Sequence, residues 1–395
     1  MALLIVSGLT SKLERHMHMQ KKTDKDYLAD AMEENRKEHT KLANALREIK
    51  LLRKDNDAAE KIRTEIYDLK AMTPDPPKWL NPKHIGQHTV GVPMTNWSDW
   101  HMGEKVDKSQ VGGKNVFNRK IARERIHRLV DSTIDLTLHH MVKPNYPGII
   151  ICLGGDMITG AIHEDLRETN DGPVQVALLD VQEQLITALK TMADKFGKVF
   201  VPCVVGNHGR TTLKPRAKDR VYTSYEWNLY CQLESYFRSD PRVVFFIPNE
   251  VDARFTVYGH NFLCTHGDAL ASHGGDGIIG AIGPIARGVF KLLRAEAASG
   301  YRVDTVILGH YHAYMPRGDL VPAVGNGSLI GYNEYAHVGL RVPASRPCQA
   351  LWFLNEKYGF TASWPVYLDE KHPYATREWL TWDKDAAHAM RKVLK

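Results

Sequence analysis

The sequence is poor in cysteine, and its few cysteines follow no recognisable pattern. It holds five in 395 residues, an odd number, and none belongs to a Cys-x-x-Cys pair. A disulfide framework and a thiolate zinc site are therefore not expected. Cys152, Cys203 and Cys264 each lie within an apolar, strand-like run. We expect them to be buried thiols in a reducing compartment.

The sequence also lacks a long apolar run. No stretch approaches the roughly 20 apolar residues that span a bilayer. The short apolar start, MALLIVSGL, has no basic leader before it. These absences predict a cytoplasmic protein that has no membrane partner. The net charge of +6 is only mildly basic, which permits a nucleic-acid partner without requiring one.

Proline and glycine are absent from residues 21–72, a highly charged segment rich in Ala, Leu, Glu and Lys. Helix formers dominate it, and we expect residues 1–72 to form a helical arm or hairpin. Its two apolar seams are too short for a sustained coiled coil. The arm either packs on the rest of its own chain or mediates homo-oligomerisation or the binding of a partner protein. Four prolines in residues 73–82 then predict a stiff linker before a single domain at 83–395.

From residue 83 onward, apolar strand-like runs alternate with helical patterns. The first half has a β-α-β rhythm and the second half is richer in hairpins. This order predicts an α/β fold, with a mixed sheet or two packed sheets flanked by helices. Helices are predicted at residues 118–141, 174–196 and 225–237. Strands are predicted at 90–97, 148–153, 198–205, 242–247, 254–258, 261–265, 304–308, 349–355 and 361–367.

Five of the predicted strands are each followed by a carboxylate, an amide or an imidazole. The side chains are Asp99 and His101, Asp156, Asn207 and His208, His266, and His310 and His312. In an extended strand end, Asp99 and His101 point the same way while Trp100 between them turns into the core. Glycines directly precede three of the motifs, and we expect each to let the backbone turn sharply. One such pair occurs by chance in many chains, but five at the same strand end indicate a divalent-metal site.

The motifs SDWH, GGD, GNH, TH and GHYH resemble, in this order, the signature of the calcineurin-like metallophosphoesterase superfamily. The resemblance covers roughly residues 90–332. It implies that the 83–395 domain is a four-layered αββα sandwich, with two mixed sheets flanked by helices, that binds two divalent metal ions. By motif, the ligands of one ion are Asp99, His101 and His312, those of the other are Asn207, His266 and His310, and Asp156 bridges both. Mixed nitrogen and oxygen ligands without thiolate favour manganese, with iron, zinc, nickel or magnesium as alternatives.

The implied reaction is hydrolysis of a phosphoester by in-line attack of a hydroxide that bridges the two ions. His208 is then placed to stabilise the phosphate or to protonate the leaving oxygen. Many members of the family carry Asp or Glu after G-N-H, but this chain has Gly209. Some other group must therefore orient His208. Arg210 is a second catalytic candidate, because its planar and permanently charged guanidinium suits phosphate.

A basic stretch follows His208 directly. Residues 210–220, RTTLKPRAKDR, hold five Lys or Arg against one Asp, and three aromatic residues follow between 222 and 227. Basic residues interleaved with aromatics predict a groove for a phosphate backbone and stacked bases, bound by Arg210, Lys214 and Arg216. The alternative is a solvated loop whose aromatic residues form the buried face of the next helix.

The motifs also narrow the branch of the family. GDMITG and GNHG differ from the G-D-x-x-D-R-G and G-N-H-E of protein Ser/Thr phosphatases. The chain more closely resembles the DNA-repair exonuclease branch (Mre11- and SbcD-like), and phage genomes encode proteins of this kind. We therefore predict a metal-dependent DNA nuclease. The alternative is a phosphoesterase that acts on a small nucleotide or cyclic nucleotide, and the presence of all seven ligands disfavours a non-enzymatic binding protein.

Other features near the motifs are interpreted as structural. Residues 272–288, SHGGDGIIGAIGPIARG, are expected to form a glycine-rich loop after His266. His163, His273 and His337 are expected to support the fold or the ligands rather than to bind metal.

Overall fold

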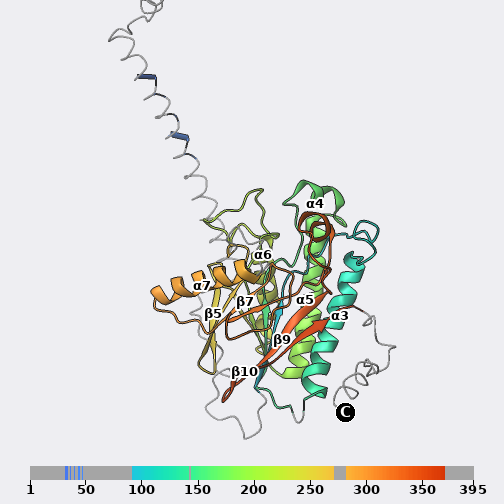
Figure 1. Cartoon of the computed structure of the whole chain (residues 1–395), viewed down its shortest axis with the longest axis vertical. Coiled ribbons are helices and arrows are strands. Elements are labelled where there is room, and N and C mark those ends of the chain that lie inside the picture. Colours follow the sequence, from blue (N-terminus) through green and yellow to red (C-terminus); the bar gives the residue numbers. More distant parts are fainter. Residues whose placement is uncertain are drawn as a thin grey trace, which may run out of the picture. The chain divides into compact units, whose positions relative to one another are not determined.

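The structure is a computed structural model that describes residues 91–141, 144–270 and 282–369, together with seven positions between 32 and 47. The chain divides into two compact units, residues 1–69 and 70–395. The seven described positions of the first unit are all helical and exposed. The predicted arm at 1–72 is described only there, and the predicted linker at 73–82 lies outside the described residues, so both stay predictions. The second unit carries the fold that follows (Figure 1).

The larger sheet of the second unit has six strands in the order β10-β9-β1-β2-β3-β4. Strands β1 to β4 run parallel to one another, whereas β9 is antiparallel to both β1 and β10. The strands are β1 (Val92–Trp97), β2 (Ile149–Leu153), β3 (Val199–Pro202), β4 (Val243–Phe246), β9 (Cys348–Asn355) and β10 (Gly359–Tyr367). All residues of β1, β2 and β3 are buried, as expected for parallel strands that are covered on both faces.

The smaller sheet has four strands in the order β5-β6-β7-β8. Strands β6, β7 and β8 run parallel, and β5 pairs with β6 as an antiparallel hairpin. The strands are β5 (Ala253–Val257), β6 (His260–Thr265), β7 (Thr305–Leu308) and β8 (Ala323–Gly325). Both sheets are therefore mixed, and each contributes parallel strands whose carboxyl ends carry predicted motifs.

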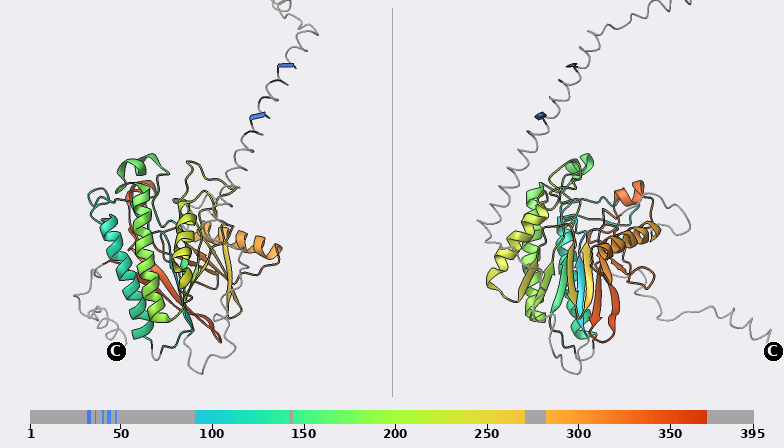
Figure 2. Two further views of the ribbon diagram at one scale, coloured as in Figure 1. Left: turned by 180° about the vertical axis from the view of Figure 1, so that it is seen from behind. Right: turned by 90° about the vertical axis from the view of Figure 1, so that its left-hand side faces the viewer.

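Helices lie on the outer faces of the two sheets, as Figures 1 and 2 show. Helices α3, α5 and α6 lie on the side of the larger sheet, and α3 contacts α5 while α5 contacts α6 and β3. Helix α7 packs on the smaller sheet, where its Ile285 and Val289 join a buried cluster with Leu263 and Val306. The helices are α3 (Arg119–Ile134), α4 (Glu164–Thr169), α5 (Val174–Phe196), α6 (Tyr225–Tyr236) and α7 (Ile282–Ala298).

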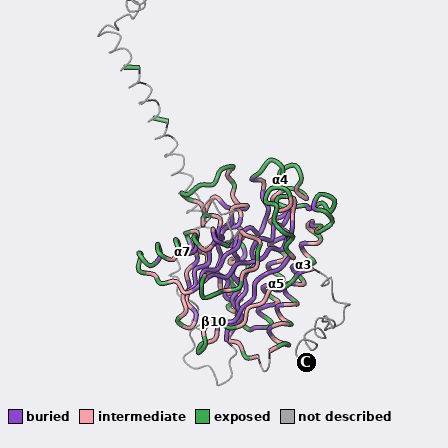
Figure 3. The backbone as a smooth tube through the Cα atoms, in the orientation of Figure 1, coloured by how far each residue is buried: buried purple, intermediate pink, exposed green. Residues whose placement is uncertain are grey.

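The main core lies between the two sheets, and Figure 3 shows buried residues concentrated in the interior of this unit. Alternate residues of each strand point into this layer, because successive side chains of a strand face opposite sides. Strand β6 sends Phe262 and Cys264 into the inter-sheet cluster, while Leu263 between them faces α7. The layer order is therefore helix, sheet, sheet, helix, which confirms the predicted αββα sandwich of two mixed sheets.

Helix boundaries follow local signals. The side chain of Asn118 accepts a hydrogen bond from the backbone N–H of Ile121 (3.0 Å), which caps the start of α3. Helix α5 begins after Pro173 and ends at Gly197, whose φ of 75° suits the left-handed end of a helix. No helix within the described ranges combines the length and the apolar character that crossing a membrane requires.

The predicted elements agree with the structure where the hydrophobic period is strong. Helix α5 has the predicted bounds, and α3 ends as an α-helix at Ile134 and continues as a π turn, Asp135–His139. The prediction of a loop over 272–288 is wrong from residue 282 onward, where α7 begins, and residues 271–281 lie outside the described residues. Gly288 belongs to this helix, and a Cβ there would lie 2.4 Å from the Leu270 carbonyl oxygen.

Candidate metal centre

The predicted ligands gather where the carboxyl ends of the parallel strands of both sheets meet. Two come from the end of β1, one from β2, one from β3, one from β6 and two from β7. Among the described residues, three groups of His, Asp or Glu have ligand atoms that lie within 4.8 Å of one another. They are Asp99, His101 and His312; His101, Asp156 and His208; and Asp156, His266 and His310. The groups share members, so they form one continuous cluster.

The backbone at these positions is unusual. The described chain has eight non-glycine residues with positive φ, and five of them are predicted ligands: Asp99, His101, Asp156, His310 and His312. Left-handed backbone costs about 1–3 kcal/mol at a non-glycine residue and is concentrated at functional sites. The strand reasoning behind the D-x-H pair is therefore wrong, since β1 ends at Trp97. The prediction for Trp100 is confirmed, because its side chain is fully buried.

Glycines beside the ligands are needed mainly for close approach. A Cβ at Gly206 would lie 2.0 Å from Oδ1 of Asp156, and one at Gly309 would lie 2.7 Å from Oδ2 of Asp99. Of the three glycines that precede the motifs, only Gly155 has a positive φ, of 86°. The predicted sharp turn therefore holds for Gly155, whereas Gly206 and Gly309 make room for a carboxylate.

We expect the Gly206→Ala variant to bind less divalent metal than the wild type, because its methyl group displaces the Asp156 carboxylate. Overpacking of this kind also destabilises a fold by roughly 1–3 kcal/mol. Elemental analysis and denaturant unfolding measure the two effects. Gly318→Ala is the matched control, since a Cβ there meets no described atom within 4 Å. Equal metal content in the two variants would contradict the close-approach argument.

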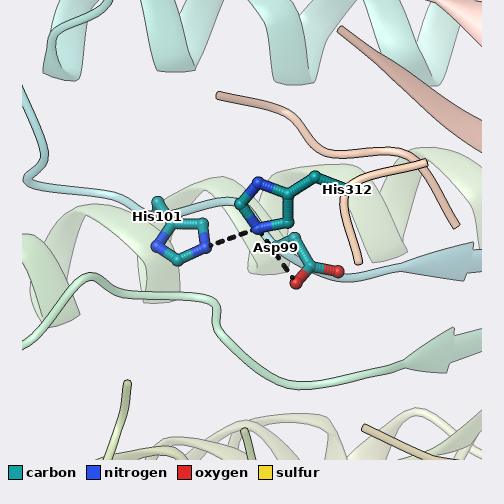
Figure 4. A group of neighbouring side chains, drawn as sticks. All are labelled: Asp99, His101 and His312. Carbon is teal, nitrogen blue, oxygen red and sulfur yellow. Dashed lines mark hydrogen bonds and ion pairs between the residues drawn. The ribbon is translucent and has the colours of Figure 1, made fainter. Parts of the chain in front are cut away.

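The first ligand group converges on the tip of the His312 ring, as Figure 4 shows. Nε2 of His312 lies 3.1 Å from Nε2 of His101 and 3.4 Å from Oδ1 of Asp99. The same Oδ1 accepts a hydrogen bond from the backbone N–H of His310 at 2.9 Å. Asp99 and His101 are buried, whereas a quarter of the His312 side chain is exposed. The group therefore opens to solvent on the His312 side.

The third group, Asp156, His266 and His310, surrounds the buried Asp156 carboxylate. Oδ2 of Asp156 lies 3.0 Å from Nε2 of His266, and the same Nε2 lies 3.1 Å from Oδ1 of Asn207. The ring of His310 packs edge-on against the ring of His266, with centroids 5.2 Å apart. Asn207 thus lies with His266, as the resemblance implies, and Asp156 takes part in two of the three groups.

Backbone carbonyls fix the orientation of two imidazoles. Nδ1 of His266 donates to the Gly154 carbonyl (2.8 Å), and Nδ1 of His208 donates to the Thr159 carbonyl (2.9 Å). A carbonyl only accepts, so both rings carry the proton on Nδ1 and leave Nε2 with a lone pair in the neutral state. The backbone N–H of His208 also donates to Oδ1 of Asp156 (2.7 Å). Thr159 is therefore the group that orients His208 in place of a side chain at Gly209.

The charges of the cluster depend on one another. Burial and the neighbouring His208 and His312 lower the pKa of His101 well below its ordinary value. Burial followed by the nearby His266 lowers the pKa of His310 to about 4. Burial opposes the charged form of His266, but the Asp156 carboxylate outweighs it and raises the pKa of His266 to about 10. The carboxylates are thus surrounded by imidazoles, two of which burial keeps neutral.

Sequence reasoning missed residues that hold Asp99 in place. The hydroxyl of Ser98 donates to Oδ2 of Asp99, and the side chain of the buried Asn326 donates to the Ser98 hydroxyl at 2.8 Å. Oδ1 of Asn326 accepts from the backbone N–H of Ala350 at 2.7 Å. Asn326 directly follows β8, as the predicted ligands follow their own strands, and this position is the sequence feature that could have identified it.

Sequence reasoning also missed Glu104, which is buried beside His101. Its Oε2 lies 3.6 Å from Nδ1 of His101, an atom that has no hydrogen-bond partner among the described residues. The same Oε2 lies 3.3 Å from the Thr159 hydroxyl, and the side chain of Asn333 donates to the other oxygen at 2.9 Å. Ligating histidines commonly donate their second nitrogen to a carboxylate, so Glu104 is suitably placed to orient His101.

The predicted substrate-binding residues differ in their surroundings. Arg210 donates to the carbonyls of Asn207 (2.7 Å), Thr212 (3.0 Å) and Leu213 (3.2 Å), so it braces its own loop. Lys214 and Arg216 are exposed on the stretch that follows.

Two of the three aromatic residues after the basic stretch, Tyr222 and Trp227, pack on each other. Trp227 is buried, and Tyr222 contacts it edge-on with ring centroids 5.3 Å apart. The alternative of a buried helix face is therefore correct for Trp227, which lies in α6. His163 is exposed, and its ring centroid lies 6.2 Å from that of His208.

The residues present fit divalent cations. The donor set is imidazole, carboxylate and amide oxygen, which suits borderline to hard metals. Ligand atoms about 2.1 Å from one ion are separated by roughly 3 Å, the spacing of the His101 and His312 nitrogens (3.1 Å). Two Nε2 atoms at this distance share either a proton, when one ring is the Nε2–H tautomer, or a cation. Both the type of donor atom and the spacing of these side chains therefore fit divalent cations.

Comparison with known proteins found similarity among solved structures alone. No family model matches this chain, and no curated protein matches it. One similar structure is a candidate 5′-nucleotidase from Staphylococcus aureus in complex with alpha-ketoglutarate (10% identity, TM-score 0.30, 77% of this chain and 58% of that chain). Another is the sulfate thiohydrolase SoxB from Thermus thermophilus (11%, 0.31, 72% and 58%). A third is a dimetal phosphatase from Danio rerio (12%, 0.33, 70% and 99%). The chain spans little more than half the length of the first two.

Proposed function

We propose that this protein is a metal-dependent phosphoester hydrolase of the calcineurin-like metallophosphoesterase superfamily. The observation that carries the proposal is the continuous cluster of three ligand groups at the carboxyl ends of strands from both sheets. The ordered sequence motifs support the same family. A cluster of this kind, held by buried carboxylates and imidazoles with left-handed backbone, is more than the fold needs for stability.

Two divalent cations fit the cluster. Asp99, His101 and His312 would hold one, and Asn207, His266 and His310 would hold the other. Asp156 would be shared, because it lies in one group with His101 and in another with His266 and His310. Bound there, the pair would polarise the phosphate oxygens and lower the pKa of water. Manganese is the favoured ion, because the ligands mix imidazole nitrogen with carboxylate and amide oxygen.

His208 is the proposed proton donor to the leaving oxygen. Its Nδ1 proton is held by the Thr159 carbonyl, so Nε2 is the nitrogen left to act on a substrate, and it donates a proton only when the ring is protonated on both nitrogens. Its backbone N–H donates to Asp156, which ties the position of this ring to the shared carboxylate. A general acid fixed in this way contributes about 10²–10⁴ in rate.

The proposed substrate is a phosphodiester, with DNA favoured. Support comes from the stretch after His208, where Lys214, Arg216 and Lys218 are all exposed. Arg210 and Arg220 at its ends are fixed to the fold, Arg210 by carbonyls and Arg220 by two 2.7 Å contacts with Asp268. The two ends of the stretch are therefore fixed to the fold, while the three basic residues between them are exposed. Such a surface suits a polyanionic backbone.

A small nucleotide is the second candidate substrate. The burial of Trp227 favours this alternative, because its ring is then not free to stack a base. A substrate panel separates the two. We expect the Mn²⁺-loaded protein to cleave DNA and bis-p-nitrophenyl phosphate faster than p-nitrophenyl phosphate. Cleavage of small nucleotides with intact single- and double-stranded DNA would contradict the DNA assignment.

We expect the double variant Lys214→Ala/Arg216→Ala to bind DNA more weakly and with a smaller salt dependence. Each lost phosphate contact lowers the slope of log K against log salt by about 0.9 on duplex DNA. Hydrolysis of bis-p-nitrophenyl phosphate should not change. Lys195→Ala is the control, since Lys195 is exposed at the end of α5, next to the amino end of β3. An unchanged salt slope in the double variant would exclude these two residues from the DNA contact.

A further inference from the structure

Helix α6 sends a carboxylate into the base of the metal centre. Glu226 is fully buried, although its neighbour in sequence, Tyr225, is not. Its Oε1 accepts a hydrogen bond from the backbone N–H of Met157 (2.6 Å). Its Oε2 accepts one from the backbone N–H of Gly206 (2.7 Å). These two amides lie directly beside Asp156 and Asn207, so a single carboxylate links the loops that carry both residues.

Glu226 occupies the space that a side chain at position 209 would need. A Cβ at Gly209 would lie 2.7 Å from both Cγ and Cδ of Glu226. The start of α6 is also attached to this residue, because the Tyr225 backbone N–H donates to the Gly209 carbonyl at 2.8 Å. Glu226 can therefore take up this position only because residue 209, which follows G-N-H, has no side chain.

The surroundings of Glu226 make a purely packing role a poor account. Among the described residues, no Lys or Arg forms an ion pair with it. A buried carboxylate without a cation partner is costly, and it is retained where its hydrogen bonds fix a geometry that the protein uses. Both of its bonds go to backbone amides that flank the ligand-bearing positions.

We infer that Glu226 is a positioning residue, which holds the Asp156 loop and the Asn207 loop at the separation that metal binding requires. The inference rests on the proposed metal centre. Glu226 acts from a helix about 20 residues further along the chain, in the place that Gly209 leaves open. It acts on the predicted ligands indirectly, through the hydrogen bonds that it accepts from the backbone N–H groups of Met157 and Gly206.

The isosteric variant Glu226→Gln tests the inference. A glutamine offers one oxygen and one NH₂ group, so one of the two backbone amides loses its acceptor. We expect the Mn²⁺ dissociation constant, measured by isothermal titration calorimetry, to rise by about 10–100-fold, as for other residues that support ligands. Gln232→Ala is the control on the same helix, because Gln232 is exposed, and its Mn²⁺ affinity should match that of the wild type.

A transplanted carboxylate makes the test specific. In the double variant Gly209→Asp/Glu226→Ala the carboxylate returns from position 209, and we expect Mn²⁺ to bind more tightly than in Gly209→Asn/Glu226→Ala. Equal affinity in these two variants, or wild-type affinity in Glu226→Gln, overturns the inference. If Glu226→Gln does not fold, Gly209→Asp/Glu226→Ala alone decides. The inference is supported if this double variant folds and binds Mn²⁺ with restored affinity, and it is overturned if the double variant does not.

The same titration separates this inference from the proposed function. A wild-type protein that binds Mn²⁺ but cleaves no phosphoester contradicts the proposed function and leaves the role of Glu226 to be judged by the variants. A wild-type protein that binds no divalent cation overturns both.

Discussion

Replacing Asp156 with asparagine is expected to reduce phosphodiester hydrolysis to background. Asp156 belongs to two of the three ligand groups, its Oδ2 lies 3.0 Å from Nε2 of His266, and its Oδ1 accepts from the His208 backbone. Asparagine keeps the size of the side chain but removes the charge that two cations would share. We expect the loss in kcat to exceed the roughly 10²–10³-fold effect of removing a single hydrogen-bond donor from an active site.

Two measurements check this result. Turnover of bis-p-nitrophenyl phosphate gives the loss in kcat, and elemental analysis gives the metal content, which should fall from two ions per chain to one or none. Asp165→Asn is the matched control, because Asp165 is an exposed carboxylate on α4 that belongs to none of the ligand groups in the described chain. An Asp156→Asn protein with two ions and normal turnover would contradict the shared-ligand assignment.

The second large effect is expected at His208. The His208→Gln variant removes the proposed proton donor, so we expect kcat on the proposed DNA substrate to fall by about 10²–10⁴-fold. The loss should be much smaller on bis-p-nitrophenyl phosphate, whose nitrophenolate leaves without a proton. Metal content should stay at two ions per chain, since the variant keeps every residue of the two proposed cation sites.

The neighbouring histidine provides the control for this experiment. His163 is exposed near His208. A loss of activity that follows from removing any imidazole close to the metal centre should therefore appear in His163→Gln as well. We expect that variant to retain nearly full activity on both substrates. A His208→Gln protein that loses equal activity on both substrates would contradict its role as proton donor.

Much of the fold was predictable, because the hydrophobic pattern is local. The uninterrupted apolar runs of β1 and β2 indicate strands that are buried on both faces, and helix α5 carries a long apolar stripe. The polar residues directly after these strands stand out against such runs. That contrast, repeated after β3, β6 and β7, is why residues that cluster in the structure could be selected before the sheets were known to meet.

The parts that could not be predicted depend on contacts between distant segments. The orientation of His208 comes from the Thr159 carbonyl, and a backbone carbonyl leaves no mark in the sequence. Asn326 reaches Ser98 across 228 residues. The left-handed backbone of Asp99 also went unpredicted, since aspartate adopts it only when the surrounding structure enforces it.

Composition was least informative in the basic stretch after His208. Its five Lys and Arg look alike in the sequence, but the structure separates them by their partners. Arg210 is bound to three carbonyls and Arg220 to Asp268, whereas Lys214, Arg216 and Lys218 are exposed. Charge count alone does not distinguish a residue that braces a loop from one that is available to a phosphate.

The most direct test of the proposed metal centre is anomalous X-ray scattering from a crystal soaked in Mn²⁺. We predict two anomalous peaks about 3.5–4 Å apart, the spacing of paired catalytic metals. One should lie among Asp99, His101 and His312, and the other among Asn207, His266 and His310, with Asp156 between them. A single peak, or no peak within this cluster, would contradict the dinuclear assignment.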